Sequence, residues 1–182
     1  MNRLKKKRAI FFDRDGVINY RLVNEYVKHP DEFRFIPDFF SFFRWVKEKN
    51  FLAIVVTNQQ GLSKGFMTED DFREITDKMQ TMVKEKTDFT FDDVYYCKDK
   101  QETQSWRRKP NPGMLLEAKE KWNVDMQNSW MIGDRKSDAQ AGKAAGVNTI
   151  LLGLHNKKEE NPAADFIVNG LNDAKRIIET TL

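Results

Sequence analysis

Cysteine is almost absent from this chain, because Cys97 is the only one among its 182 residues. A single cysteine excludes a disulfide bond within the chain. Proteins of oxidising compartments often depend on such bonds, whereas a reducing compartment keeps thiols free. The sequence therefore favours a cytoplasmic protein.

Long apolar runs are also missing. A membrane-spanning helix needs about 20 consecutive apolar residues, and the hydrophobic runs of this chain are much shorter. The chain does not open with a basic and then apolar leader that ends in a cleavage site. We therefore expect no membrane partner.

No segment rich in proline, glycine or serine divides the chain, and no repeat is present. A chain of this length can bury a core without disulfides, so we expect one domain over residues 1–182. We also expect the protein to be a monomer. Residues 1–8 form a basic leader with Arg3, Lys5, Lys6, Lys7 and Arg8, on a net charge of only +3. This leader could contact nucleic acid or be solvated at the entry to the first strand, and we favour the second interpretation.

Short apolar runs alternate with amphipathic stretches of helical length. The runs predict strands at 10–12, 52–56, 94–96, 130–132, 149–152 and 166–168, and the stretches predict helices at 38–49, 69–86, 112–122, 137–145 and 172–180. Several runs are apolar on both faces, as parallel strands covered on each side are. The pattern indicates an α/β protein with a doubly wound, mostly parallel sheet and helices on both faces. Ligands of such sheets bind beyond the carboxyl ends of the strands.

Two carboxylates, Asp13 and Asp15, follow the first predicted strand and precede Gly16. Side chains at i and i+2 of a strand point to the same side. Two such charges about 4–5 Å apart repel each other by roughly 3–4 kcal/mol at an effective dielectric constant near 20. A cation between them, or a proton on one of them, would relieve this repulsion. A solvated turn or a calcium loop would explain the same residues without catalysis.

Polar residues follow the other predicted strands as well. Thr57 and Asn58 follow the second strand, Asp134 follows the fourth, and Arg108 and Lys109 lie between the third and the fourth. Each could be an ordinary turn, a solvated loop or the start of a helix. Their joint position after successive strands instead predicts a site for Mg²⁺ and a phosphate, because Mg²⁺ prefers oxygen ligands.

The sequence resembles the phosphatases of the haloacid dehalogenase (HAD) superfamily over nearly the whole chain, roughly residues 10–178. Four segments carry this resemblance in order, namely 13–19 (DRDGVIN), 56–61 (VTNQQG), 108–114 (RKPNPGM) and 131–138 (MIGDRKSD). Within the superfamily the chain is most similar to the D-glycero-D-manno-heptose 1,7-bisphosphate phosphatases and the related histidinol-phosphate phosphatases.

The resemblance implies a role for each residue of the site. Asp13 would be the nucleophile that forms an aspartyl-phosphate, and Asp15 would protonate the leaving oxygen and then activate water. Mg²⁺ would be held by Asp13, the main-chain carbonyl of Asp15, and Asp134. The remaining implied ligands of the phosphoryl group or the substrate are Thr57, Lys109, Asn58 and Arg108.

The chain departs from many heptose-bisphosphate relatives at a small zinc site of three cysteines and one histidine. Only Cys97 of that set is present, with Asp99 in place of the histidine and Ser105 and Arg107 in place of the later cysteines. Tetrahedral zinc cannot be held by this set, so we predict no zinc. The loop at 98–107 must then be ordered by other contacts, Trp106 among them, or be mobile. His29 and His155 are isolated and are interpreted as structural or solvated.

The segments between the motifs are too short for a large cap domain, so the site is expected to be open.

The leading hypothesis is a Mg²⁺-dependent phosphomonoesterase acting on a small phosphorylated sugar, heptose 1,7-bisphosphate above all. Histidinol-phosphate phosphatase and nucleic-acid 3′-phosphatase are alternatives, although no long basic and aromatic track favours nucleic acid. A receiver-like signalling domain would place its phosphorylated aspartate after a later strand, and the order of motifs disfavours it.

Overall fold

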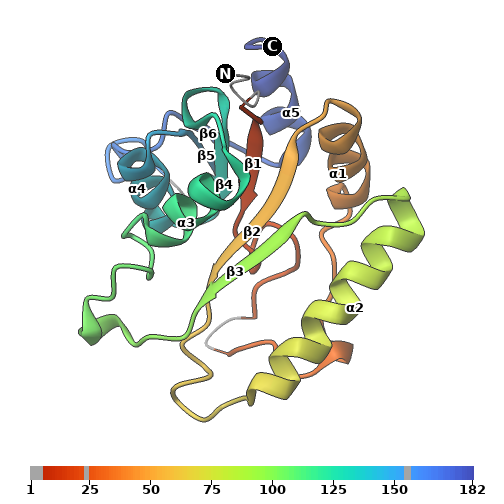
Figure 1. Ribbon diagram of the computed structural model, residues 1–182, viewed down its shortest axis with the longest axis vertical. Coiled ribbons are helices and arrows are strands. Elements are labelled where there is room, and N and C mark those ends of the chain that lie inside the picture. The colour runs from red at the N-terminus through yellow and green to blue at the C-terminus, as the bar shows by residue number, and fades with distance from the viewer. Residues whose placement is uncertain (1–5, 23–24, 154–156) are drawn as a thin grey trace, which may run out of the picture.

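The computed structural model describes residues 6–22, 25–153 and 157–182. Six strands form one sheet in the order β3-β2-β1-β4-β5-β6, and every neighbouring pair is parallel (Figure 1). Their bounds are β1 Ala9–Phe12, β2 Leu52–Asn58, β3 Asp93–Cys97, β4 Trp130–Gly133, β5 Asn148–Leu152 and β6 Phe166–Val168. Each predicted strand is therefore present within a few residues of its expected bounds.

Five α-helices cover the two faces of the sheet. They are α1 Phe39–Glu48, α2 Glu69–Thr87, α3 Gly113–Trp122, α4 Lys136–Ala145 and α5 Leu171–Glu179. One core cluster joins α1, α2 and α5 to one face, and a second joins α3 and α4 to the other (Figure 1). Strand β1 shows why both faces need cover, because Ile10 and Phe12 enter the first cluster while Ala9 and Phe11 enter the second. The predicted doubly wound α/β fold is confirmed.

The helix ends follow the local sequence. The Thr68 hydroxyl accepts a hydrogen bond from the Asp71 amide (3.1 Å) at the start of α2, and the Asp71 carboxylate accepts one from the Thr68 amide (2.8 Å). This reciprocal pair is a capping box. Helix α4 ends at Ala145 and is followed by Gly146, whose positive φ of 83° lets the chain turn away. The described residues also contain three short 3-10 helices that no periodicity indicates, at Pro30–Glu32, Gln101–Thr103 and Met126–Asn128.

The order of the strands places a switch point between β1 and β4, because the chain winds outward from this pair in both directions. The loops that follow β1 and β4 therefore leave the sheet side by side. Within the described residues these connections carry no large cap domain (Figure 1). In the same part of the chain, no helix has the length and apolar character that crossing a membrane requires.

The basic leader is described only from Lys6 onward, and residues 1–5 and His155 lie outside the described residues. Lys7 lies over the ring of Trp122 (5.7 Å), and the guanidinium of Arg8 lies over the ring of Phe51 (4.5 Å). His29 is exposed at the start of the first 3-10 helix. Lys7 and Arg8 thus pack on aromatic rings at the entry to β1, whereas Lys6 is exposed.

Candidate active site

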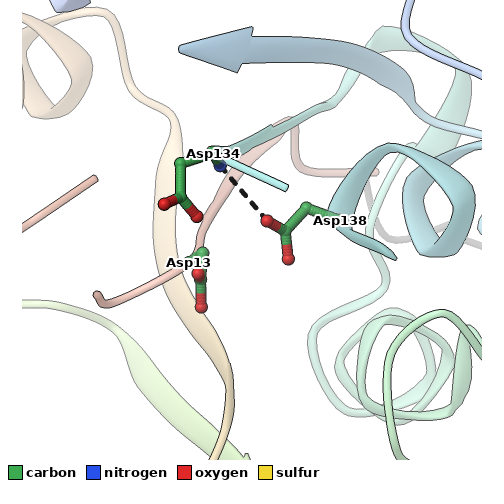
Figure 2. Close-up of side chains that lie close together, drawn as sticks. All are labelled: Asp13, Asp134 and Asp138. Atoms are coloured by element: carbon green, nitrogen blue, oxygen red, sulfur yellow. Dashed lines mark hydrogen bonds between the residues drawn. The ribbon is translucent and has the colours of Figure 1, made fainter. Parts of the chain in front are cut away.

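Three carboxylates converge at the switch point, beyond the ends of β1 and β4. Asp13 follows β1, Asp134 follows β4, and Asp138 comes from the first turn of α4 (Figure 2). One oxygen of each lies within 4.8 Å of the others. Asp138 is fixed by the start of α4, because its Oδ2 accepts hydrogen bonds from the amides of Asp134 (3.2 Å) and Arg135 (3.0 Å).

Lys109 supplies a buried positive charge to this cluster. Its Nζ lies 2.9 Å from Asp13 Oδ1 and 2.7 Å from Asp138 Oδ1, and it also donates to the carbonyl of Val56 (2.7 Å). Burial would lower the pKa of Lys109, but the charges of Asp13 and Asp138 outweigh it and raise that pKa. Lys109 is therefore held as an ammonium ion against the Asp13 carboxylate.

Burial raises the pKa of Asp13, and the nearby charge of Asp138 adds to this effect against the opposing charge of Lys109. The pKa of Asp134 is also raised, again by burial first, although hydrogen bonding to Arg21 opposes it. Both shifts have the same leading cause, burial, and in both a neighbouring carboxylate adds to it. Such a site favours an added cation.

Asp15 has a different environment from Asp13. Its carboxylate accepts hydrogen bonds from Arg14 Nη2 (3.0 Å), Asn19 Nδ2 (2.9 Å) and Gln59 Nε2 (3.0 Å). Burial would raise the pKa of Asp15, but the charge of Arg14 and these hydrogen bonds lower it. The two aspartates of the pair thus have pKa values shifted in opposite directions, so their environments differ.

Thr57 and Asn58 lie at the end of β2, as predicted. Thr57 is buried, and its hydroxyl accepts a hydrogen bond from Gln59 Nε2 (2.9 Å). The side-chain amide of Asn58 exchanges two hydrogen bonds with the backbone of Lys109, at 2.9 and 3.1 Å. Asn58 therefore fixes the segment that carries Lys109, which is a structural contact that the sequence did not indicate.

Arg108 lies on the wall of the pocket above the carboxylates. Its Nη1 donates to the carbonyl of Asp99 (2.9 Å), and its Nη2 lies 3.5 Å from Gln60 Oε1. The pocket has a volume of about 890 Å³ and is also lined by the predicted residues Asp13, Asp15, Thr57, Asn58 and Lys109. The structure thus brings six of the seven predicted site residues to one cavity, and the seventh, Asp134, has a carboxylate oxygen within 4.8 Å of one of Asp13.

Several residues of the site were not assigned from the sequence. Asp138 stands in a quoted motif, and its position four residues after Asp134 at a helix start could have indicated a shared location. Arg14 and Gln59 stand beside assigned residues, but the contact of Gln59 with Asp15 joins positions 44 residues apart, and its contact with Arg14 joins positions 45 apart. Arg21 belongs to no pattern, and only the fold shows that it reaches Asp134 (2.7 Å).

The loop at 98–107 is ordered by hydrogen bonds. Cys97 Sγ lies 3.5 Å from Asp99 Oδ2 and 3.8 Å from Ser105 Oγ, so the retained cysteine contacts two of the three substituted positions. Asn111 Nδ2 donates to the carbonyl of Ser105 (2.9 Å), and the Gly113 amide donates to the carbonyl of Trp106 (3.1 Å). These contacts connect the loop to the start of α3.

Comparison with known proteins agrees with this geometry. A family model described as HAD-hydrolase-like matches residues 106–174. The D-glycero-alpha-D-manno-heptose-1,7-bisphosphate 7-phosphatase of Campylobacter jejuni is 40% identical over 156 residues, which cover 85% of this chain and 87% of that protein. The D-glycero-beta-D-manno-heptose-1,7-bisphosphate 7-phosphatase of Escherichia coli K12 is 38% identical over 181 residues, which cover 94% of this chain and 93% of that protein.

A solved structure is similar in fold. It is the D,D-heptose 1,7-bisphosphate phosphatase from B. bronchiseptica, complexed with magnesium and phosphate, and it matches with a TM-score of 0.83 and 24% identity over 95% of this chain and 99% of that one. The parallel sheet, the carboxylates at its switch point and these relatives lead to one conclusion. The chain belongs to the haloacid dehalogenase superfamily, and it is a phosphatase that hydrolyses phosphoric monoesters.

Proposed function

We propose that this phosphatase removes the 7-phosphate of a D-glycero-D-manno-heptose 1,7-bisphosphate and that it requires Mg²⁺. The observation that carries the proposal is the convergence of Asp13, Asp134, Asp138 and Lys109 beneath a pocket of about 890 Å³. The names of the relatives support the substrate, since the Campylobacter and Escherichia coli proteins are 7-phosphatases of the alpha and beta anomers. The choice between the anomers is left to the experiment.

The residues of this site fit a magnesium ion. Asp13 Oδ2, the main-chain oxygen of Asp15 and Asp134 Oδ1 all accept hydrogen bonds from one nitrogen, Arg21 Nη2, so the three oxygens face one point. Carboxylate and carbonyl oxygens are the ligands that Mg²⁺ prefers. Asp138 is the less suitable ligand, because Lys109 and two backbone amides already bond its oxygens. Bound there, the ion would neutralise charge on the transferring phosphoryl group.

In this proposal a carboxylate oxygen of Asp13 attacks phosphorus, and the bond between phosphorus and the ester oxygen breaks. Asp15 gives a proton to the departing sugar oxygen, and for this step the negative charge of the bound phosphate must offset the contacts that lower the pKa of Asp15 in the free protein. In the second half of the reaction Asp15 takes a proton from water, whose oxygen attacks the aspartyl-phosphate and releases inorganic phosphate. The hydrogen bonds from Arg14, Asn19 and Gln59 favour the ionised Asp15 that this second half needs.

Lys109 and Thr57 are proposed to bind the transferring phosphoryl group. Phosphoryl transfer depends mainly on alignment and on neutralising the charge of the equatorial oxygens. Lys109 already lies against the proposed nucleophile, and the Thr57 hydroxyl lines the same cavity. Arg108 is proposed to bind the second phosphate or the sugar, and Asn58 to assist by holding the backbone of Lys109.

A phosphate-release assay tests the substrate. Both anomers of the heptose bisphosphate, histidinol phosphate and a 3′-phosphorylated oligonucleotide should be compared at matched salt, with Asp13→Asn protein as the control for contaminating activity. The proposal predicts the highest kcat/KM for one heptose anomer. An equal or higher kcat/KM for histidinol phosphate or the oligonucleotide would reassign the enzyme to that class.

The cytoplasmic location and the monomeric state of the protein stay proposals. Size-exclusion chromatography with light scattering measures the oligomeric state.

A further inference from the structure

Two cations of different accessibility neutralise the acidic cluster. Lys109 is 2% exposed at its side chain and is also bonded to the Val56 carbonyl, so it is locked into the interior. Arg21 lies on the opposite side of Asp13, and its side chain is 29% exposed on the pocket wall. Of these two cations, only Arg21 can leave the carboxylates for the pocket without opening the core.

Arg21 uses the same oxygens that are proposed for the metal. Its Nη2 contacts Asp13 Oδ2 (3.4 Å), Asp134 Oδ1 (2.7 Å) and the main-chain oxygen of Asp15, while its Nε donates to Asp134 Oδ2 (2.9 Å). A guanidinium nitrogen and a metal ion cannot both occupy the point between these three oxygens. Their binding must therefore be mutually exclusive.

The charges in contact favour such an exchange. Within the described residues, the positive side chains that form ion pairs with Asp13, Asp134 and Asp138 are Lys109 and Arg21. Replacing a singly charged guanidinium by a doubly charged ion would add one positive charge to these three carboxylates. The backbone next to Arg21 is held by the hydrogen bond from the Tyr20 amide to the Arg34 carbonyl (2.9 Å), so rotation of the side chain is sufficient for the exchange.

We infer that Arg21 is a built-in competitor of the divalent cation, which occupies the metal point in the metal-free protein and sets the Mg²⁺ affinity of the enzyme. This inference rests on the proposed Mg²⁺ site. Arg21 then has two measurable effects that arise from the same interaction. Its side chain stabilises the metal-free protein, and it weakens the binding of Mg²⁺. Both effects arise without substrate and can be measured without catalysis.

Isothermal titration of metal-free protein with MgCl₂ tests the competition. Arg21→Ala should bind Mg²⁺ about tenfold more tightly than the unmutated chain, which corresponds to the loss of one charge-assisted contact. Arg21→Lys, which keeps the charge but not the fork of donors, should fall between them. Arg135→Ala is the matched control, because Arg135 lines the same pocket but is not bonded to the three oxygens, and its affinity should change less than about threefold.

A thermal melt supplies the second readout. Without metal, Arg21→Ala should melt at a lower temperature than the unmutated protein. Saturating Mg²⁺ should shrink this difference, because the metal then displaces Arg21 of the unmutated protein from the carboxylates. Equal Mg²⁺ affinity of Arg21→Ala and the unmutated protein would overturn the competition while leaving the metal site intact. An equal gain in Arg135→Ala would show a general charge effect and would also overturn it. Folded protein that binds no Mg²⁺ in any variant would instead refute the metal site itself.

Discussion

Asp13 is the residue on which the chemistry depends, and its surroundings allow a clean substitution. Lys109 and Arg21 contact separate oxygens of its carboxylate, at 2.9 and 3.4 Å. Asparagine has the same shape and keeps one oxygen as an acceptor, but it cannot form an aspartyl-phosphate. Asp13→Asn should therefore fold and lose at least about 10⁴-fold in kcat, as loss of a nucleophile typically costs. Hydrolysis of p-nitrophenyl phosphate measures this loss, and turnover at the unmutated rate would show that the nucleophile is elsewhere.

Asp15 tests the second half of the reaction. Asp15→Asn removes the base that activates water, so the phosphoenzyme should break down more slowly and accumulate. Rapid acid quench with ³²P-labelled substrate measures the accumulated phosphoenzyme as protein-bound label. Asp13→Asn is the control, because it should carry no label. If no label is trapped in Asp15→Asn while the unmutated enzyme turns over, a covalent route would be contradicted.

At the scale of single residues, the sequence predicts residues that follow strands better than residues whose contacts arise only in the fold. Asp13, Asp15 and Asp134 could be assigned because they follow strands, and the ends of parallel strands share one edge. Arg21 could not, because its contact with Asp134 joins positions 113 residues apart and no local pattern marks it. The pairing of Lys109 with Asp138 was missed for the same reason, although both residues lie in recognised segments.

Among the structural elements, the turn after β1 controls the position of the metal ligands. Gly16 has a φ of +99°, and a Cβ at this position would lie 2.1 Å from Asp134 Oδ2. Alanine there would be strained by about 1–2 kcal/mol and would push the Asp134 carboxylate away from Asp13.

Gly16→Ala should therefore lower the melting temperature modestly and weaken Mg²⁺ binding severely. Titration calorimetry and a thermal melt measure the two effects. The matched control is Gly65→Ala, because Gly65 also has a positive φ (73°) but no atom within 4 Å of an added Cβ. Equal effects on Mg²⁺ binding in the two variants would contradict the role of the β1 turn.

The strands and the five α-helices were predictable because each carries its own hydrophobic pattern, and α2 and α4 also have end signals at Thr68 and Gly146. The loop at 98–107 was not, because its order arises from contacts with distant residues. Asp99 is held by Arg108, and Ser105 by Asn111, after the turn that brings these segments together. The three 3-10 helices are too short to show a period.

For the whole molecule, we predict a metal content that differs from that of zinc-bearing relatives. The thiol of Cys97, the only cysteine, is within 4 Å of Asp99 and Ser105 rather than of further thiols, and such a set does not favour tetrahedral zinc. Elemental analysis of the purified protein should find no stoichiometric zinc. EDTA should abolish activity, and Mg²⁺ should restore it. One tightly bound zinc per chain would contradict this prediction.

The account as a whole depends on one arrangement, in which Asp13 can attack phosphorus while Asp134 and the main-chain oxygen of Asp15 share a divalent cation with it. A crystal structure with MgCl₂ and beryllium fluoride tests it most directly, because beryllofluoride mimics a phosphoryl group on a carboxylate. We predict a BeF₃⁻ group on the Asp13 carboxylate beside Lys109, with Mg²⁺ between the three oxygens and Arg21 displaced from them. Beryllofluoride on another residue, or an Asp13 that binds neither group under saturating conditions, would contradict the account.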